Sequence, residues 1–193
     1  MPRTGERSRT DPRQRILDAS YDLFVDRGVR AVGINEIIEV AGVAKASFYS
    51  YFPSKNDLIL AFLDRRRSIF TIGYLGAESQ KRGASPEEQL FTIFDLFDEW
   101  FRAPDFTGCP YIRALIEIGP EHEVGEASAG YLREMRDQVQ EAAEAMNLID
   151  PREFAECWMI LLQGSVVAAM ATGYTPDRVK QMGRMLLASH RRS

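Results

Sequence analysis

Residues 37–57 read IIEVAGVAKASFYSYFPSKND, and this stretch decides how the rest of the chain is interpreted. A short segment with apolar residues at helical spacing ends near Gly42, and a second one begins almost at once near Lys45. Pro53 closes the second segment, because the residue before a proline is biased away from helical dihedrals. Two short helices joined by a tight glycine turn are the arrangement of a helix-turn-helix.

The second short helix, over about 45–52, has the two different faces that a DNA-reading helix needs. Phe48 and Phe52 are four residues apart and can both point inward. Polar side chains are left for the outer and flanking faces, where they suit phosphates and base edges in a major groove about 12 Å wide. These candidate DNA-binding residues are Lys45, Ser47, Tyr49, Ser50 and Tyr51, with Lys55 as a further cation at the start of the next helix.

The flanking sequence predicts a helix on each side of this pair. Asp11 and Pro12, followed by Gln14 as a capping-box residue, favour a helix that starts at Pro12 and ends before Gly28. Ser54 and Asp57 form a second capping box, which predicts a long helix from about residue 55 to about residue 75.

Residues 12–63, and above all 37–57, resemble the DNA-binding region of the TetR family of regulators. The resemblance covers the first third of the chain in sequence motif and the whole chain in the order and sizes of its helices. It implies a homodimer that presents two recognition helices to a near-palindromic operator in double-stranded DNA, and an effector pocket in the larger domain. By resemblance, Lys45, Ser47, Tyr49, Tyr51 and Lys55 match positions that commonly touch DNA, with Asn35 as a further candidate.

Two positions depart from the pattern of the family. Gly33 and Ala44 stand where family members often carry Ser or Thr before the two short helices. The expected hydroxyl caps are therefore missing, and a poor cap such as Ala44 costs on the order of 1 kcal/mol.

Helical spacing recurs to the end of the chain, so we expect an all-α fold of about nine helices. The small and polar stretch 76–85 lacks an apolar face and is the best candidate for a boundary between two parts of the chain, after one helix ends near residue 75 and before the next begins at Pro86. We expect a helix-turn-helix domain over 1–54, with the long helix from about 55 connecting it to a ligand-binding and dimerisation domain over 55–193. Later helices are expected from Pro86, over 111–118, 124–146 and 151 to about 172, and over 176–190, with Asp150 and Thr175 capping the last two.

The larger domain holds more aromatic side chains than one helix face needs, which suits a small and largely apolar effector. Dense packing of a helical bundle would explain the same residues. Candidate polar anchors are Arg113, Glu117, Tyr131 and Gln163. The ligand-binding candidates are Phe94, Phe97, Trp100, Phe101, Ile112, Tyr131 and Trp158.

Small residues in the helix over 151–172 and methionines in the helix over 176–190 favour a four-helix interface across a two-fold axis. Burial of the same faces within one chain is the alternative. The interface candidates are Gly164, Ser165, Ala168, Met182, Met185 and Leu186.

The composition narrows the functional classes. Its 193 residues, 45% of them hydrophobic, are enough for a packed core. No apolar run approaches the roughly 20 residues of a membrane span, so we expect a cytoplasmic protein without membrane contact. Cys109 and Cys157 lie far apart, and neither they nor the two histidines form a catalytic or metal motif, so no catalytic residue, metal or cofactor is expected.

The charge is divided unevenly along the chain. Residues 1–67 hold 12 Lys and Arg against 9 Asp and Glu, whereas residues 68–193 hold 12 against 19. A locally basic part can be attracted to phosphate while the acidic remainder limits unspecific adhesion to polyanions. Arg3, Arg7 and Arg9 form a basic tail that could reach the minor groove or remain unengaged.

Together these features predict a ligand-responsive, sequence-specific transcriptional regulator, a repressor released by a small molecule. The long helix from residue 55 would couple ligand binding to the separation of the two recognition helices. A helical protein-binding adaptor without DNA binding, and an all-α enzyme without a cofactor, are the alternatives.

Overall fold

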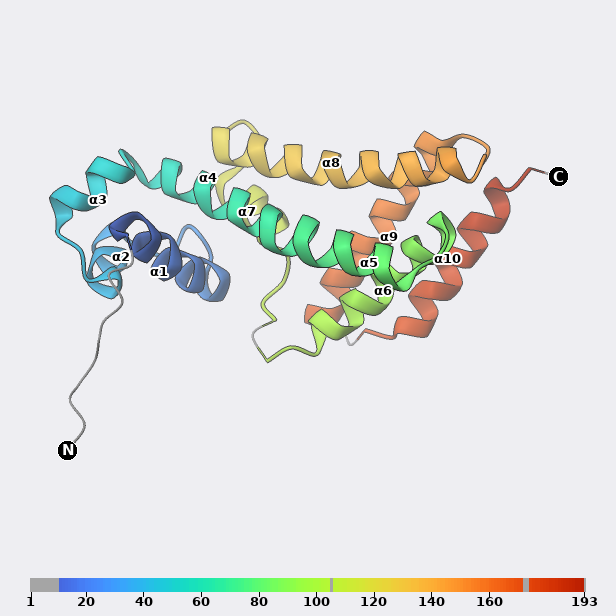
Figure 1. The fold of residues 1–193 in the computed structure, drawn as a ribbon, viewed down its shortest axis with the longest axis horizontal. Helices are drawn as coiled ribbons and strands as arrows, with labels where there is room; N and C mark the ends of the chain where they lie inside the picture. Colours follow the sequence, from blue (N-terminus) through green and yellow to red (C-terminus); the bar gives the residue numbers. More distant parts are fainter. Residues whose placement is uncertain (1–10, 105, 172–173, 193) are drawn as a thin grey trace. The chain divides into compact units, whose positions relative to one another are not determined.

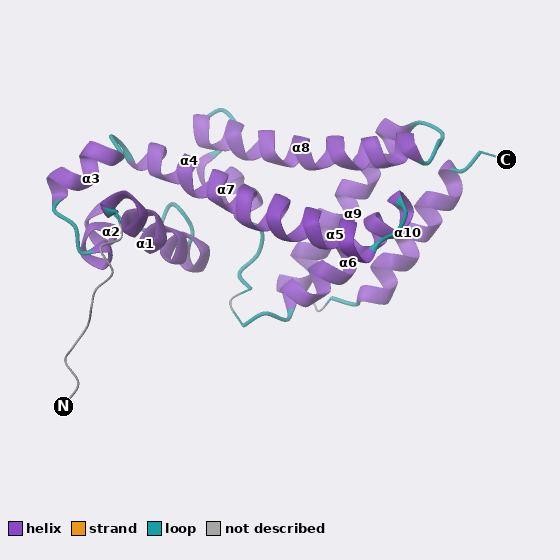
Figure 2. Ribbon diagram, in the orientation of Figure 1, coloured by secondary structure: helices purple, strands orange, loops and turns teal. Residues whose placement is uncertain are grey.

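The computed structural model describes residues 11–104, 106–171 and 174–192, and all regular structure within these ranges is helical (Figures 1 and 2). The all-α expectation is therefore confirmed. The basic tail with Arg3, Arg7 and Arg9 lies outside the described residues. The chain divides into two compact units, Met1–Phe62 and Leu63–Ser193, which are described in turn.

The first unit contains α1 (Pro12–Arg27), α2 (Ile34–Ala41), α3 (Lys45–Tyr51) and the start of α4 (Lys55–Arg66). Asp11 caps α1 by accepting a hydrogen bond from the Arg13 backbone N–H at 3.2 Å. The expected capping-box role of Gln14 is wrong, because its side-chain amide donates instead to Asp18 Oδ1 at 2.9 Å.

Aromatic packing holds the first unit together. The Phe24 and Phe62 rings meet edge to face with centroids 5.3 Å apart, and Phe48 and Phe52 are both buried. Such pairs add to the free energy that burial of their area contributes. The apolar residues buried here include Ile16, Leu17, Phe24, Ile37, Phe48, Phe52, Leu58, Ile59 and Phe62.

One helical run extends from Lys55 to Arg82 through α4, the π-helical segment η1 (Arg67–Gly76) and α5 (Ala77–Arg82). The expected loop over 76–85 is wrong for most of its length. Alanine, glutamate, glutamine, lysine and arginine are strong helix formers, and Glu78 pairs with both Lys81 and Arg82 on the surface. If this run is counted as one helix, the described residues form nine helices, as expected.

The second unit is completed by α6 (Pro86–Phe101), α7 (Pro110–Ile118), α8 (Glu123–Ala145), α9 (Pro151–Ala171) and α10 (Pro176–His190). Helix α8 packs against α7 and α9, while α10 packs against α9 and α6 (Figure 1). Asp150 caps α9 as expected, by accepting a hydrogen bond from the Glu153 N–H at 3.1 Å. The expected Thr175 cap of α10 is wrong, because its side chain makes no capping hydrogen bond.

Trp158 of α9 is the centre of the second unit's core. Its ring contacts Phe91, Phe94 and Phe154, with centroids 5.0–5.4 Å away. Gly183 lets α10 approach this cluster, since a Cβ atom there would lie 3.2 Å from both Phe94 and Trp158.

Helix α9 is long and apolar enough to cross a membrane, judged by length and composition alone. This departs from the expectation that no segment of the chain comes near that length. In the structure, Phe154, Trp158 and Leu162 place one side of α9 in the core, a position in which a soluble protein also uses such helices.

Candidate nucleic-acid interface and effector cavity

The turn between α2 and α3 has the geometry of a helix-turn-helix. Gly42 adopts a left-handed conformation with φ 61° and ψ 40°, which glycine tolerates without steric cost. Its N–H donates to the Glu39 carbonyl at 3.1 Å. The backbone therefore reverses direction tightly before α3 begins at Lys45.

Arg15 of α1 positions this turn, a role that we did not expect from the sequence. Its Nη2 atom donates to the carbonyl oxygens of Ala41 and Gly42 at 2.5 and 2.6 Å. Cations are favoured at the C-terminal end of a helix, where carbonyl groups lack helical partners. Arg15 thus fixes the end of α2 against α1, and only its place in a helix that packs behind the pair could have suggested this.

Helix α3 separates packing residues from exposed ones, as its spacing predicts. Phe48 and Phe52 are buried, whereas Tyr49 and Tyr51 each keep 41% of their surface exposed. Single tyrosines exposed to this extent on a short helix are available to a partner. Of the remaining candidates, Asn35, Lys45 and Ser50 are exposed, while Ser47 and Lys55 are half-buried.

The helix ends on either side of α3 differ in how they are capped. Gly33 and Ala44 make no side-chain hydrogen bond to α2 or α3, as their chemistry dictates. At the start of α4, the Asp57 N–H donates to Ser54 Oγ at 3.1 Å, and the Ser54 N–H donates to Asp57 Oδ2 at 2.9 Å. The predicted capping box of α4 is therefore present.

A small apolar cavity of about 30 Å³ lies among the end of α4, η1, α6, α7, α8 and α9 in the second unit. Three of the residues expected to bind ligand, Phe97, Trp100 and Ile112, line it, as does the candidate anchor Gln163. Tyr111, Met135 and Met159, which belong to the same apolar set in the sequence, also line it. The sequence did not indicate the other lining residues, which include Arg66, Phe70, Thr71, Leu75, Cys109, Leu162 and Val166.

Four of the expected ligand residues lie elsewhere. Phe94 and Trp158 fill the core, because their rings pack directly against each other. Phe101 contacts Tyr174 at 4.7 Å between centroids, and Tyr131 packs against Tyr111 at 5.4 Å. Aromatic content therefore predicted the presence of a cavity better than its lining.

The other two candidate anchors pair with each other. Arg113 and Glu117 of α7 form an i,i+4 ion pair at 2.9 Å and are absent from the described lining of this cavity.

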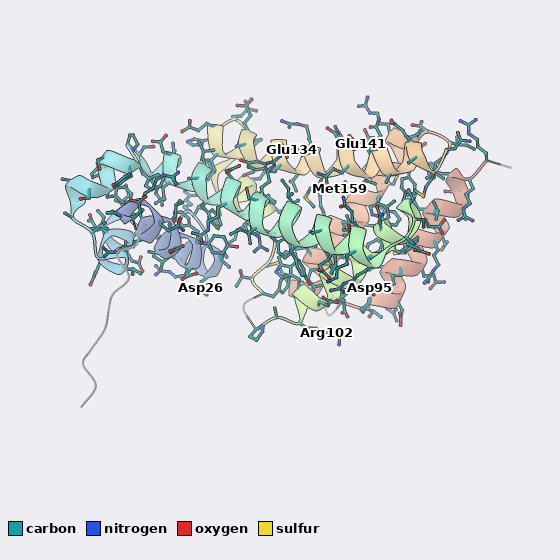
Figure 3. All side chains as sticks on the ribbon, in the orientation of Figure 1. Asp26, Asp95, Arg102, Glu134, Glu141 and Met159 are labelled. Atoms are coloured by element: carbon teal, nitrogen blue, oxygen red, sulfur yellow. The ribbon has the colours of Figure 1, made fainter. Side chains whose placement is uncertain are left out.

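A larger groove of about 400 Å³ adjoins the cavity and runs between η1 and α5, α6, α8 and α9. Glu141 of α8 and Met159 of α9 belong to its lining and are labelled in Figure 3. The cavity and the groove share the side chains of Thr71, Leu75, Met135, Met159 and Leu162 as a common partition.

Polar groups in the cavity wall are held neutral by burial. Thr71 Oγ1 and Tyr111 Oη share a hydrogen bond of 3.2 Å. Burial raises the pKa of the Tyr111 hydroxyl, and it also raises the pKa of the Cys109 thiol. Neither group carries a negative charge at neutral pH, and a protonated thiol is a poor nucleophile.

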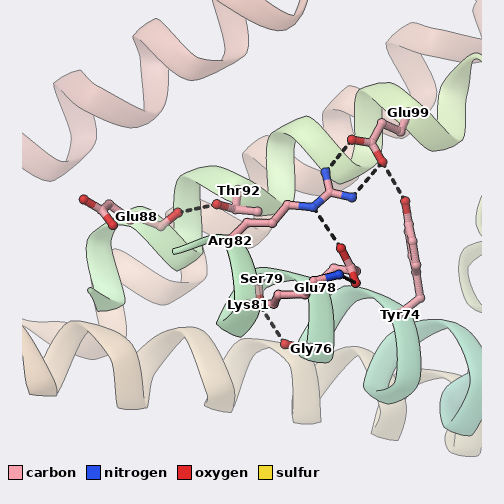
Figure 4. A network of polar contacts seen from close by, with 9 residues as sticks. All are labelled: Tyr74, Gly76, Glu78, Ser79, Lys81, Arg82, Glu88, Thr92 and Glu99. Atoms are coloured by element: carbon pink, nitrogen blue, oxygen red, sulfur yellow. Dashed lines mark hydrogen bonds and ion pairs between the residues drawn. The ribbon is translucent and has the colours of Figure 1, made fainter. Parts of the chain in front are cut away.

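A polar network joins η1, α5 and α6, three elements that contribute other residues to the lining of the groove (Figure 4). Arg82 donates to Glu99 of α6 at 2.5 Å and to Glu78 at 2.9 Å, and the Tyr74 hydroxyl donates to Glu99 at 2.8 Å. The hydrogen bonds from Arg82 and then from Tyr74 lower the pKa of Glu99. The network therefore ties η1 and α5 to α6 while Glu99 is ionised.

Helices α9 and α10 carry an exposed apolar face. Ile160 and Met185 keep 69% and 66% of their surface exposed, and both line a shallow apolar hollow with Cys157, Leu161, Met182 and Leu186. Of the expected interface residues, Gly164, Met182 and Met185 are exposed and Ala168 and Leu186 are half-buried. Ser165 is wrong as an interface residue, because it is 2% exposed and donates to the Leu162 carbonyl at 2.6 Å.

The chain matches a known family model over residues 16–62, described as bacterial regulatory proteins of the tetR family. A TetR transcriptional regulator from Streptomyces avermitilis has the same fold, with a TM-score of 0.84 and 26% identity over 94% of this chain and 98% of the other. This protein belongs to the TetR family. The resemblance predicted from residues 12–63 is thereby confirmed.

Among curated relatives, the HTH-type transcriptional activator FasR of Mycolicibacterium smegmatis is 30% identical over 62% of this chain and 58% of its own length. An HTH-type regulator of Lactococcus lactis is 28% identical over 55% of this chain and 54% of its own length. This TetR protein thus spans somewhat more than half of the length of these two relatives.

The TetR fold also extends to EbrR, a multidrug binding protein whose structure was solved in complex with malachite green. Identity is 19%, the TM-score is 0.69, and the match covers 95% of this chain and 99% of EbrR. At this identity the likeness concerns the fold. The TetR family is not enzymatic, which argues against the alternative of an all-α enzyme.

Proposed function

We propose that this TetR protein is a cytoplasmic, sequence-specific transcriptional repressor that a small molecule releases from its operator. The observation that carries the proposal is the pair of exposed tyrosines, Tyr49 and Tyr51, on a short helix anchored from behind by Phe48 and Phe52. Membership of a family of bacterial regulatory proteins supports the same conclusion.

In this proposal, α3 enters the major groove of operator DNA. Tyrosine hydroxyls on rigid rings reach phosphates and base edges, while Lys45 and Lys55 add charge near the backbone. Ser50 already donates to the Ser47 carbonyl at 2.8 Å, so its hydroxyl contacts DNA only as an acceptor or after rotation. Asn35 lies in the first turn of α2, and the N-terminus of a helix favours contact with a phosphate.

Pairing of two chains would use the apolar face of α9 and α10. Exposed apolar patches of this kind mark interaction sites on soluble proteins, and a two-fold interface places the same patch on both subunits. A dimer reads two half-sites, because one short recognition helix contacts too few bases. The interface would be centred on Ile160, Met182, Met185 and Leu186, which line the shallow hollow, and would extend along α9 to Gly164 and Ala168.

The effector site in this proposal is the cavity with its adjoining groove. Its lining is mainly apolar with few polar groups, as is usual for small-molecule sites. Helix α4 begins in one unit and ends in the other, so a change at Arg66 is joined covalently to the DNA-binding unit. The effector would shift the population of DNA-competent dimers by its different affinity for the two states.

Selection of bound duplexes from a random library tests the proposal. Wild-type protein is expected to enrich a near-palindrome, with affinity that falls as salt rises. Tyr49→Ala and Lys55→Ala are expected to weaken the selected duplex, whereas the control Arg152→Gln, an exposed residue of α9, leaves it unchanged. Failure to enrich any sequence at low salt would contradict DNA reading and favour a protein-binding adaptor.

Two further measurements cover dimerisation. Sedimentation should show a dimer, and Met185→Glu should yield monomers that bind the selected duplex far more weakly. An unchanged dimer in Met185→Glu and in Ile160→Glu would exclude this face as the interface.

A further inference from the structure

The outward side of α3 carries two small side chains, Ala46 and Ser50. Successive residues of an α-helix are rotated by about 100°, so Ala46 and Ser50 each point about 160° away from Phe48, in opposite senses. Both are exposed, whereas Phe48 is fully buried. We call these two residues the outer ridge of α3. They lie almost directly opposite the side that packs against the rest of the unit.

Longer side chains of α3 flank the outer ridge. The Tyr49 ring meets the Phe48 ring edge to face, with centroids 5.3 Å apart and planes at 81°. This contact keeps the Tyr49 ring beside the buried side of the helix. Lys45 lies on the same flank, because residues four apart share a face of a helix.

Short side chains at the outer ridge matter, because an α-helix only just fits a major groove. A helix with its side chains is about 10–12 Å across, and the groove is about 12 Å wide. Bulky residues at the ridge would hold the backbone away from the bases, whereas alanine and serine allow close approach. Lys45 and Tyr49 then face the walls of the groove, where the phosphates lie. The outer ridge is therefore the part of α3 that meets the base edges.

The side chain of Ala46 is a single methyl group, so it recognises a base only through apolar contact. In the major groove, the 5-methyl group of thymine is the apolar feature of a base edge, and alanine is a residue that contacts it. Such a contact removes apolar surface of both groups from water, which favours binding. Ala46 therefore suits thymine.

The hydroxyl of Ser50 is limited to accepting hydrogen bonds. Its proton is donated to the Ser47 carbonyl at 2.8 Å, which leaves only lone pairs for a further partner. A phosphate oxygen also accepts, so it does not suit Ser50 in this conformation. Adenine N6 and cytosine N4 are the donors at base edges in the major groove. Ser50 therefore suits an exocyclic amino group.

The spacing of the outer ridge fits neighbouring base pairs. Ala46 and Ser50 lie about 6 Å apart along the helix axis, at about 1.5 Å per residue. Base pairs of B-DNA are stacked about 3.4 Å apart. The two side chains therefore reach positions one or two base pairs apart when α3 follows the groove.

We propose that Ala46 reads the methyl group of one thymine in each operator half-site, and that Ser50 accepts a hydrogen bond from the amino group of an adenine or cytosine one or two base pairs away. This inference rests on the proposed function, because it takes α3 to be the helix that enters the major groove. It adds the bases that are read and the two residues that select them.

Deoxyuridine tests the thymine contact, since it pairs as thymidine does and lacks only the methyl group. Each thymine of the duplex selected by the wild-type full chain is replaced in turn, and affinity is measured by fluorescence anisotropy. At one position per half-site, affinity should fall about threefold to fivefold, the effect of one buried methyl group. Replacement at this position in both half-sites should lower affinity by about tenfold or more.

Ala46→Gly removes the methyl group of the protein, and should bind the thymine and deoxyuridine duplexes equally at that position. The ratio of the two affinities is the readout, because a loss of helix stability lowers both alike. Ala44→Gly is the matched control, since Ala44 is exposed and caps α3 away from the outer ridge. It should keep the wild-type ratio. The assignment of Ala46 is overturned if no thymine responds in the wild type, or if the wild-type ratio persists in Ala46→Gly.

Selection repeated with Ser50→Ala tests the second contact. The wild type should retain adenine or cytosine at a position one or two base pairs from the sensitive thymine, and Ser50→Ala should lose this preference. An unchanged preference would overturn the assignment of Ser50. An equal loss of affinity for all sequences would overturn it too, because that result identifies a phosphate contact.

The same selections separate this inference from the proposed function. If the wild type enriches no duplex, the proposed function fails and the inference fails with it. If the wild type enriches a near-palindrome in which no thymine responds to loss of its methyl group, the proposed DNA reading stands and the thymine contact of Ala46 is excluded.

Discussion

The two units of this protein expose their functional side chains in opposite ways. In Met1–Phe62 the candidate site is a convex set of exposed residues, and the core behind it holds the short helix α3 in place. In Leu63–Ser193 the candidate site is internal, so the residues that would bind a ligand also contribute to the fold. Function and stability can therefore be separated by mutation in the first unit but are coupled in the second.

The largest expected effect is a loss of folding stability caused by a substitution in the core of the first unit. Phe48→Ala should destabilise folding by about 3–5 kcal/mol, because it leaves a cavity at a fully buried site. Tyr49→Ala, the next residue, loses only an edge-to-face contact with Phe48, so it should cost about 0.5–1.5 kcal/mol and still lose operator binding. Urea unfolding combined with duplex binding measures both. A similar stability loss in the two variants would refute the separation of function from stability.

Arg15 provides the next test, because its hydrogen bonds connect α1 to the turn that precedes α3. Arg15→Gln removes charged hydrogen bonds to Ala41 and Gly42, and should cost about 1–3 kcal/mol. Operator affinity should fall at every salt concentration, since the turn and not a phosphate contact is affected. A reduced salt dependence in Arg15→Gln would instead identify Arg15 as a phosphate ligand.

Restoring a missing helix cap should raise the free energy of unfolding of the first unit. Ala44 has an extended conformation and no side-chain cap, so Ala44→Ser should stabilise α3 by about 0.5–1 kcal/mol. Gly33→Ser meets no atom within 4 Å of its new Cβ and should gain only a few tenths of a kcal/mol, because glycine is already a fair cap. Thermal unfolding ranks the two variants, and a larger gain from Gly33→Ser would contradict this account.

The smallest effect concerns the second unit and appears only in alkali. Burial raises the pKa of Tyr174 from 10.0 to about 12. The folded state therefore holds its proton more tightly than the unfolded state, so this contribution is complete below pH 10 and is lost as pH rises toward 12. Tyr174→Phe should reduce the fall in melting temperature over that range. An unchanged slope would show that Tyr174 ionises as freely in the folded chain as in the unfolded one.

How much the sequence could predict also follows this division. Exposed side chains on a short helix are governed by local spacing, so Phe48 and Tyr49 were assigned to the correct faces of α3. Cavity residues come from six elements, α4, η1, α6, α7, α8 and α9, and their convergence depends on packing that local patterns do not encode. Phe94 and Trp158 illustrate this, because aromatic content alone could not distinguish the core from the cavity wall next to it.

The errors in the fold have local causes of the same kind. The segment 77–82 lacks an apolar stripe, which suggested a loop, but surface pairs and the network around Arg82 stabilise it as a helix. Arg15 could not be assigned its role from sequence, because its partners are carbonyl groups 26 and 27 residues away. The sequence therefore predicts elements and exposed faces more reliably than contacts between elements.

The π-helical segment Arg67–Gly76 supplies Phe70, Thr71, Leu75 and Gly76 to the walls of the cavity and the groove. A π-helix pairs each N–H with a carbonyl five residues back, and an α-helix pairs it four residues back. Rewinding a turn of this segment from π-helical to α-helical pairing would rotate Leu75 relative to Phe70 about the helix axis. A ligand that fills the cavity would then rotate one part of this continuous helical run relative to the other about their common axis.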